Sequence, residues 1–354
     1  MDSTTKMTER KAFLWSLLFV GIVAISFSAI FVKWSDAPVS VIGMYRLGLT
    51  LLGMTPFLFR YRAELRAVSR RDWLLLSFSG FMLALHFLLW MGSLRYTTVA
   101  SSTVLMTLEP VLVMIGALIF FRERIRPAAI LAMGVALLGA VLIGWGDFRL
   151  SGAALYGDLL SVLGTIAVVV HMLLGQALRG RISSFVYSYT VFLAAALSFA
   201  VYNGAAGFSF FVGYSANDWL IFALMAAVPT VFGHLLFNWL LKYVGATTVS
   251  MAVLGEPVGA SLLAWALLAE TLTPLQAFAG ALLLGGVWLF LRSGGSHGGS
   301  AEAGPAEAPG ADAGAAAEAD AVATAGAQAA RTAHAPGASA PAPAETATAV
   351  PLGK

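Results

Sequence analysis

Long runs of apolar residues, separated by short polar segments, dominate the chain. Runs long enough to cross a hydrocarbon layer of about 30 Å fall at about 12–32, 38–59, 73–93, 97–121, 127–146, 153–175, 183–208, 217–241, 245–269 and 274–291. The segments between the runs hold the charges and the turn-forming residues. The pattern therefore predicts an all-α membrane protein with ten transmembrane helices.

The two halves of this pattern resemble each other. Residues 147 positions apart match without a gap, among them Glu109-Pro110-Val111 with Glu256-Pro257-Val258 and Gly139 with Gly286. Each half holds five predicted helices, and because five is odd the second half enters the membrane from the opposite side. The sequence thus predicts two inverted-topology repeats, an arrangement that in transporters places the binding site near the bilayer midplane.

The predicted organisation has four parts: a cytoplasmic N-terminus (1–11), two five-helix repeats (12–146 and 153–291) and a disordered tail rich in Ala, Pro and Gly (292–354). The first apolar run is long for a signal peptide and is interpreted as a retained span.

The lysines and arginines predict an orientation. If the N-terminus is cytoplasmic, most of them fall in cytoplasmic segments, Arg179 and Arg181 included, and only Lys33, Arg95 and Arg149 fall in outer loops. The positive-inside rule then places both termini in the cytoplasm.

Composition narrows the class of protein. The chain is 59% hydrophobic and 11% charged, whereas a soluble domain has about 25% charged residues. It has no cysteine, which excludes disulfides and cysteine-based metal sites. The net charge of +3 is explained by the membrane charge rule, so no nucleic acid is expected. The lipid bilayer and a small-molecule substrate are the expected partners, with no cofactor and no metal.

Two glutamates lie near the middle of otherwise uncharged runs. An acid at that depth costs about 2.5–3.5 kcal/mol on insertion scales, and the prolines that follow, Pro110 and Pro257, each remove a helical hydrogen bond. In a dry site Glu109 and Glu256 would tend to be protonated, and they could exchange protons when the cavity opens. The alternative is that they only hold helices together, and that the prolines are packing kinks.

Five further side chains are candidates for a substrate or ion site. Arg46 is the only base deep in a span, so it could counter a glutamate, anchor an anionic group or form a structural ion pair. His86 and Trp90 are four residues apart and share a helix face, as do His234 and Asn238. Both faces could line a cavity, although a histidine bonded to a backbone carbonyl is an equally simple explanation. His171 is a weaker candidate.

The residues around these glutamates resemble a known family. The segments 94–102 (LRYTTVASS) and 121–125 (FRERI), together with 241–246 (LKYVGA), 255–257 (GEP) and 268–272 (LAETL), are similar to two copies of the EamA repeat of the drug/metabolite transporter superfamily. The resemblance implies a carrier of small metabolites or drugs in the bacterial cytoplasmic membrane, often an exporter. That family often has the first proline without an acid before it, so Glu109 is a departure.

The favoured function is therefore secondary active transport of a small metabolite or drug-like compound by alternating access, with export as the expected direction. The sequence leaves open whether transport is coupled to protons and whether the protein forms a homodimer. An uncoupled facilitator or exchanger is the alternative. An intramembrane enzyme is disfavoured, because Leu155 replaces the first glycine of a Gly-x-Gly-Asp motif and no His-Glu-x-x-His occurs. A channel is also disfavoured, because the sequence shows no ring of like charges.

Overall fold

The computed structural model describes residues 3–97, 99–122, 124–145, 152–269, 274–293 and 296–297. Residues Met1–Gly299 form one compact unit. The second unit, Ser300–Lys354, lies outside the described residues, and so does most of the tail predicted for 292–354.

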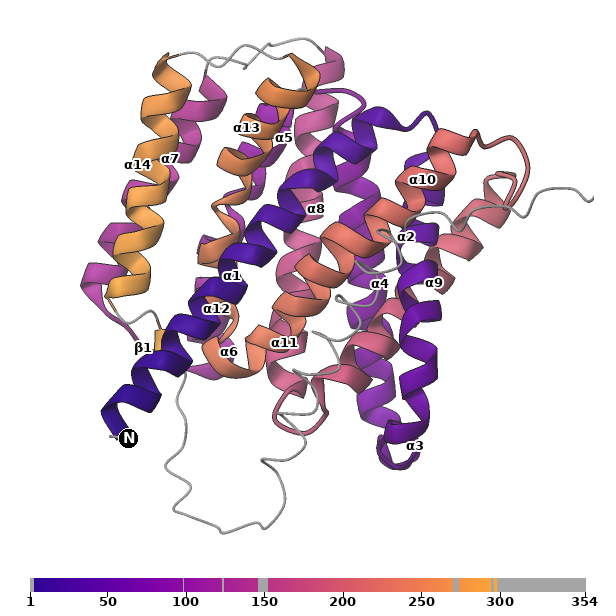
Figure 1. Cartoon of the computed structure of the whole chain (residues 1–354), viewed down its shortest axis with the longest axis horizontal. Helices are drawn as coiled ribbons and strands as arrows, with labels where there is room; N and C mark the ends of the chain where they lie inside the picture. Colours follow the sequence, from indigo (N-terminus) through magenta and orange to yellow (C-terminus); the bar gives the residue numbers. More distant parts are fainter. Residues whose placement is uncertain are drawn as a thin grey trace, which may run out of the picture. The chain divides into compact units, whose positions relative to one another are not determined.

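Helices make up nearly all of the described chain (Figure 1). In order they are α1 (Ser3–Trp34), α2 (Val39–Met54), η1 (Thr55–Phe57), α3 (Leu58–Ala67), α4 (Arg70–Ser93), α5 (Val99–Met106), α6 (Glu109–Phe121), α7 (Pro127–Trp145), α8 (Gly152–Leu178), α9 (Ser184–Ala205), α10 (Ala216–Met225), the π-helical η2 (Ala226–Leu235), α11 (Leu236–Val244), α12 (Ala246–Val253), α13 (Glu256–Leu268) and α14 (Pro274–Arg292). Two strands of two residues each, β1 (Arg124–Ile125) and β2 (Ser296–His297), pair antiparallel.

Seven helical stretches in the described chain are long and apolar enough to cross a membrane. They are Ala12–Trp34, Val39–Ala67, Arg70–Ser93, Gly152–Leu178, Ser184–Ala205, Ala216–Val244 and Ala246–Leu268, and shorter apolar helices cover Glu109–Phe121, Pro127–Leu142 and Ala277–Arg292. The prediction of an all-α membrane protein is therefore confirmed. One predicted boundary is wrong: the helical stretch expected to end near residue 59 continues to Ala67, because hydropathy marks the end of an apolar layer and not the end of a helix.

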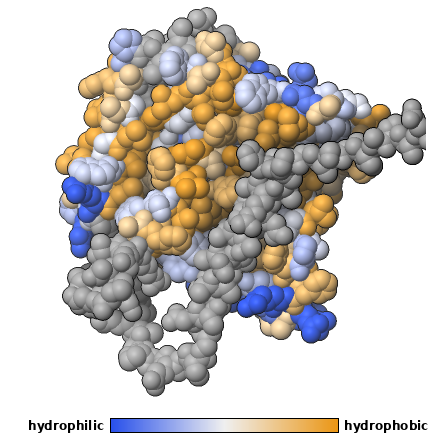
Figure 2. Space-filling view, viewed as in Figure 1, coloured by the Kyte–Doolittle hydropathy of each residue, from blue (hydrophilic) through white to orange (hydrophobic). Residues whose placement is uncertain are grey.

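Large apolar side chains are exposed on the surface of the helices. Phe59, Val201 and Leu131 are 78%, 74% and 73% exposed. Figure 2 shows apolar residues over much of the visible face, with the strongly hydrophilic ones toward its edges. In water such a surface would promote aggregation, whereas in a bilayer it contacts lipid while the helices satisfy their own backbone hydrogen bonds.

Two glycines allow α7 and α14 to pack closely side by side (Figure 1). A Cβ atom added to Gly139 would lie 2.5 Å from the backbone nitrogen of Leu283, and one added to Gly286 would lie 2.4 Å from the backbone nitrogen of Ala136. The two contacts are reciprocal, because Leu283 and Gly286 each lie 147 residues after Ala136 and Gly139. Rising numbers on α7 meet falling numbers on α14, so the two helices run antiparallel.

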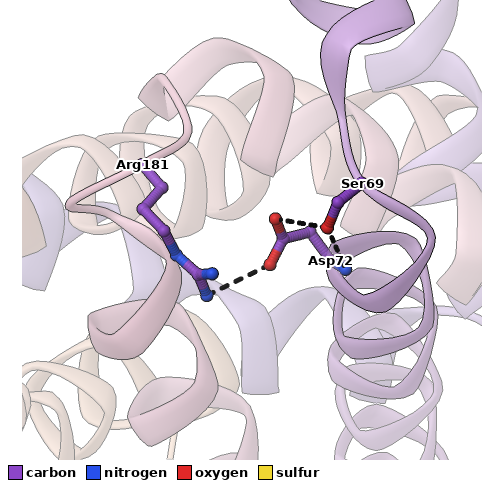
Figure 3. Close-up of polar contacts among 3 residues, drawn as sticks. All are labelled: Ser69, Asp72 and Arg181. Carbon is purple, nitrogen blue, oxygen red and sulfur yellow. Dashed lines mark hydrogen bonds and ion pairs between the residues drawn. The ribbon is translucent and has the colours of Figure 1, made fainter.

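Serine caps begin three of the helices, and two of these serines, Ser69 and Ser215, are each paired with an aspartate. Ser69 accepts a hydrogen bond from the backbone N–H of Asp72 at the start of α4, and its hydroxyl donates to the Asp72 carboxylate (Figure 3). Asp72 also forms an ion pair of 3.1 Å with Arg181. Because the Arg181 side chain is 53% exposed, this pair contributes little to stability. Ser215 and Asp218 form the corresponding capping box at the start of α10.

Replacing either capping serine by alanine is expected to destabilise the protein by about 1 kcal/mol, because an N–H in the first helical turn loses its acceptor. Ser215→Ala should have the larger effect, since Asp218 also accepts hydrogen bonds from the Ser35 hydroxyl and the Asp36 N–H in the α1–α2 connection. Thermal unfolding in detergent measures both. Ser198→Ala, inside α9, is the control, and a shift equal to that of Ser215→Ala would contradict the capping argument.

Candidate functional site

Two long helices are interrupted at equivalent points. α5 ends at Met106 and α6 begins at Glu109, while α12 ends at Val253 and α13 begins at Glu256. The breaks lie just before Pro110 and Pro257, which occupy the first turn of each new helix. A proline is tolerated there because its missing N–H would have no helical partner. Each glutamate therefore lies at a helix N-terminus, where the helix dipole favours a negative charge.

A small cavity lies between the two breaks. The volume that water can enter is about 10 Å³, room for one water molecule at most. The lining residues are Thr103, Met106, Thr107, Glu109, Pro110, Ser250, Val253, Leu254, Glu256 and Pro257. The last five residues are the first five shifted by 147 positions. Both glutamates are therefore brought to one place, and each half of the chain supplies lining residues at matching positions.

A larger cavity adjoins the small one and shares Met106, Glu109, Val253 and Glu256 with it. The volume of this cavity that water can enter is about 50 Å³, which is room for a few water molecules, so the helices would have to move apart to admit a drug-sized molecule. Its other lining residues come from α1, α4, α8, η2, α11 and α12. Six candidates from the sequence meet there, namely Glu109, Glu256, His86, Trp90, His234 and Asn238.

Several polar atoms on the cavity wall are buried without a hydrogen-bond partner. They are Ser28 Oγ, Trp90 Nε1, Glu109 Oε1 and Asn238 Nδ2. A buried polar group without a partner costs about 1–3 kcal/mol, so water or a polar ligand would be stabilised at these four positions. A ligand with polar groups would satisfy these atoms.

Arg46 does not line either cavity. It is fully buried on α2, where its Nε donates to Thr230 Oγ1 over 3.0 Å. The guanidinium lies 4.1 Å from the ring centre of Phe87, a residue that does line the larger cavity. Arg46 forms no ion pair with either glutamate, although its charge acts on Glu256. A direct Arg46–glutamate salt bridge, one of the interpretations from sequence, is therefore not present.

The π-helical segment η2 helps to position Arg46. Pro229 lies inside this segment, and a wide π turn is one way for a helix to accept a residue that cannot donate a backbone hydrogen bond. The next residue, Thr230, donates its hydroxyl to the Met225 carbonyl over 2.6 Å. Its oxygen is thereby fixed in place to accept the hydrogen bond from Arg46.

The two cavity histidines are held differently. His86 Nδ1 lies 3.0 Å from the carbonyl oxygen of Gly164, and since a carbonyl only accepts, Nδ1 is the protonated nitrogen. The His86 and Trp90 rings are nearly parallel, with centres 6.3 Å apart. His234 meets the Phe87 ring edge-on at 4.9 Å. His86 therefore has the carbonyl partner that the simpler interpretation of the sequence expected, while still facing the cavity.

A polar cluster around His171, the weaker candidate from the sequence, adjoins the larger cavity. His171 lines the cavity, and its Nδ1 lies 2.9 Å from the hydroxyl of Ser79, which also lies 2.9 Å from the Tyr187 hydroxyl. Arg179 stacks on the Tyr187 ring at 4.2 Å and donates from Nη2 to Asn238 Oδ1 over 3.3 Å.

Arg179 was expected in a cytoplasmic loop, but it is only 6% exposed. It follows the last residue of α8 directly and folds back along that helix, which the charge pattern could not show. A signal for the rest of the cluster was present, since Ser79 lies seven residues before His86 and so shares its helix face. No group of three or more histidine or acidic side chains in the described chain could hold a metal ion.

A multi-pass helical membrane protein with an internal, partly polar cavity has the architecture of a small-molecule transporter. The chain belongs to the EamA-like transporter family, whose model matches residues 11–145 and 155–292. It is accordingly a membrane transporter and not an enzyme.

Known proteins are similar to this chain along much of its length. An uncharacterized transporter of Archaeoglobus fulgidus is 26% identical over 75% of this chain and 91% of its own length. The riboflavin transporter ImpX of Fusobacterium nucleatum subsp. nucleatum is 24% identical over 55% of this chain and 67% of its own length. A crystal structure with a TM-score of 0.62 and 20% identity covers 78% of this chain and 96% of the other, which at this identity shows the fold alone.

Proposed function

We propose that this protein is a proton-coupled secondary transporter that exports a small metabolite or drug-like compound by alternating access. The observation that carries the proposal is the larger cavity, where Glu109 and Glu256 meet partnerless polar atoms on an otherwise apolar wall. The substrate would occupy this cavity. His86, Trp90, His234 and Asn238 would contact it, and Arg46 would act on it from behind Phe87.

The proposal includes ten membrane helices arranged as two inverted five-helix repeats, at 12–146 and 153–291. Three features support it. The small cavity is lined by residues in matched pairs. The contacts of Gly139 and Gly286 are reciprocal, between antiparallel helices. The residues that directly follow α6 and α13, Arg122 and Ala269, have the same left-handed conformation, with φ of 53° and 55°.

Proton coupling is supported by two opposing influences on the same carboxyl groups. Removal from water disfavours the charged form, while the N-termini of α6 and α13 favour it. Balanced influences of this kind allow a carboxyl group to be protonated in one state of the cavity and ionised in another. Opening the cavity to either side would change its hydration and shift that balance.

We further propose that the protein lies in the bacterial cytoplasmic membrane with both termini in the cytoplasm, as the distribution of lysines and arginines favours. Single cysteines introduced into this cysteine-free chain would test the orientation by labelling from one side. The mass of the purified protein in detergent would decide between a monomer and a homodimer.

The central experiment is an uptake and efflux screen with purified protein in proteoliposomes. A panel of small metabolites is tested with and without a pH gradient, and it includes riboflavin because one relative is named as a transporter of it. We expect at least one compound to accumulate only when the gradient is imposed. Collapse of the gradient with a protonophore is the control, and unchanged accumulation after collapse would contradict proton coupling.

An uncoupled facilitator is the second candidate. It is favoured by the position of Glu109 and Glu256 in the first turns of α6 and α13, where an acid can act solely to stabilise a helix terminus. Transport that equilibrates the compound across the membrane and never concentrates it would support this function.

A further inference from the structure

Two arginines are buried close to the larger cavity without an acidic partner. Arg46 and Arg179 are 0% and 6% exposed. Each stacks on an aromatic ring, Phe87 for Arg46 and Tyr187 for Arg179. Nη1 and Nη2 of Arg46 and Nε and Nη1 of Arg179 are buried without a hydrogen-bond acceptor. A buried cation costs several kcal/mol unless an opposite charge compensates it.

The buried acids in the described chain do not supply that compensation. Asp72 pairs with Arg181, and Asp218 accepts hydrogen bonds from Ser35, Ser215 and Asp36. Glu109 and Glu256 form no ion pair with either buried arginine. Two positive charges without an ion-pair partner therefore lie behind the described walls of the cavity, and the two carboxyl groups on those walls can become neutral.

The Arg179 side chain occupies a space beside the cavity that depends on Gly175. Gly175, one turn earlier on α8, leaves the space for it, because a Cβ atom there would lie 2.7 Å from the Tyr187 hydroxyl and 3.4 Å from Arg179 Nη2. Arg179 then donates to Asn238 Oδ1. Since a guanidinium can only donate, this contact fixes the Asn238 amide with its oxygen toward Arg179.

Of the four partnerless atoms on the cavity wall, two are N–H donors, whereas Ser28 Oγ can donate or accept and Glu109 Oε1 only accepts when it is ionised. With its oxygen bound to Arg179, Asn238 has its Nδ2 group left over, and that atom is buried without a partner at the cavity wall. The Trp90 Nε1–H is likewise partnerless on the wall. Donors without acceptors, backed by positive charge, match the oxygens of an acid and repel a cation.

We propose that the larger cavity binds an organic anion with an aromatic body. Its acidic group is bound by the donors of Asn238 and Trp90, with Arg179 behind Asn238 as a positioning residue and Arg46 adding positive charge from behind Phe87. The aromatic body lies among Phe87, Trp90 and Phe237. This inference rests on the proposed transport function and names its substrate class.

The test uses three probes with the same ring and different charge: indole-3-acetate, indole-3-acetamide and tryptamine. Binding to the purified protein in lipid nanodiscs is measured by calorimetry at one pH. We expect the anion to bind about tenfold or more tightly than the amide, and tryptamine to bind most weakly. Equal affinities, preference for tryptamine, or no binding of the anion would overturn the proposal.

Variants of Arg179 separate charge from packing. Arg179→Gln is expected to weaken indole-3-acetate binding about tenfold while binding of the amide is unchanged, and Arg179→Lys should recover most of the loss. Arg181→Gln, two residues away and half-exposed, is the matched control and should behave like wild type. An equal loss for acid and amide in Arg179→Gln would overturn the role given to its charge. If Arg179→Gln does not fold, the probe series on wild type still decides.

Failure of the anion site and failure of transport would give different results. If the protein concentrates neutral or cationic compounds in proteoliposomes while anions neither bind nor compete, the substrate class is wrong and the transporter stands. If no compound is moved, although indole-3-acetate binds with the expected charge preference, transport is wrong and the anion site stands.

Discussion

Glu109→Gln and Glu256→Gln are each expected to abolish transport driven by a pH gradient, to below about a tenth of the wild-type rate, without preventing membrane insertion. Glutamine keeps the shape and polarity of a protonated glutamate but cannot release a proton. Both side chains line the two cavities, so the substitution removes the titrating group and leaves the wall otherwise intact. Initial rates in proteoliposomes, with and without an imposed gradient, measure the effect.

The control for these variants is Asp158→Asn. Asp158 lies in the second turn of α8 and lines neither cavity, so its loss should leave gradient-driven transport close to wild type. Equilibrium exchange of labelled substrate, which needs no net proton movement, should persist in both glutamine variants. Wild-type gradient-driven rates in Glu109→Gln and Glu256→Gln would exclude a proton role and favour the facilitator.

The two glutamates occupy matched positions in unequal surroundings. The charge of Arg46 acts on Glu256, and α9, the helix of the second half that would correspond to α2, contains no lysine or arginine. Matched geometry therefore does not require matched roles, and one of the two carboxyl groups can carry the proton while the other shapes the cavity. Unequal residual rates in the two single variants would reveal the difference.

The membrane character of the fold could be predicted from the sequence because it depends on local features. Each apolar run is long enough to form a helix by itself, and the prolines mark the sites where helices end. The composition of the site could be predicted less well from the sequence. Arg179 and Asn238 form a hydrogen bond although they are 59 residues apart in the chain, and nothing local at either position indicates the contact. The position of Arg179 after a helix and before Arg181 is typical of a surface loop.

The cost of burying each glutamate could also not be predicted from the sequence alone. An acid in the middle of a continuous helix and an acid at a helix N-terminus have different costs, since only the second meets free N–H groups and a favourable dipole. The sequence predicted a helix bent at Pro110 and Pro257. In the structure two residues separate the helices in each case, and Leu108 and Gly255, which precede the glutamates, keep helical dihedral angles. Each helix is therefore bent and locally loosened at the proline, which lowers the cost of burying the carboxylate beside it.

Gly286→Ala is expected to destabilise the protein by about 1–3 kcal/mol, whereas Gly285→Ala, one residue earlier, should be neutral or slightly stabilising. A Cβ atom at Gly286 would lie 2.4 Å from the nitrogen of Ala136, and no atom lies within 4 Å of one at Gly285. The clash is with backbone, so it cannot be relieved by a change of rotamer, and α7 and α14 must separate.

Gly139 and Gly134 on α7 allow the same comparison to be made on the other helix. Gly139→Ala should be as destabilising as Gly286→Ala, because its Cβ would lie 2.5 Å from the nitrogen of Leu283, and Gly134→Ala is the open-space control. Thermal unfolding in detergent gives all four values. Because both glycines act on one interface, the double variant should cost less than the sum of the two single losses. Equal unfolding midpoints for Gly285→Ala and Gly286→Ala would show that α7 and α14 are not in close contact, and would remove one of the three supports for the inverted repeat.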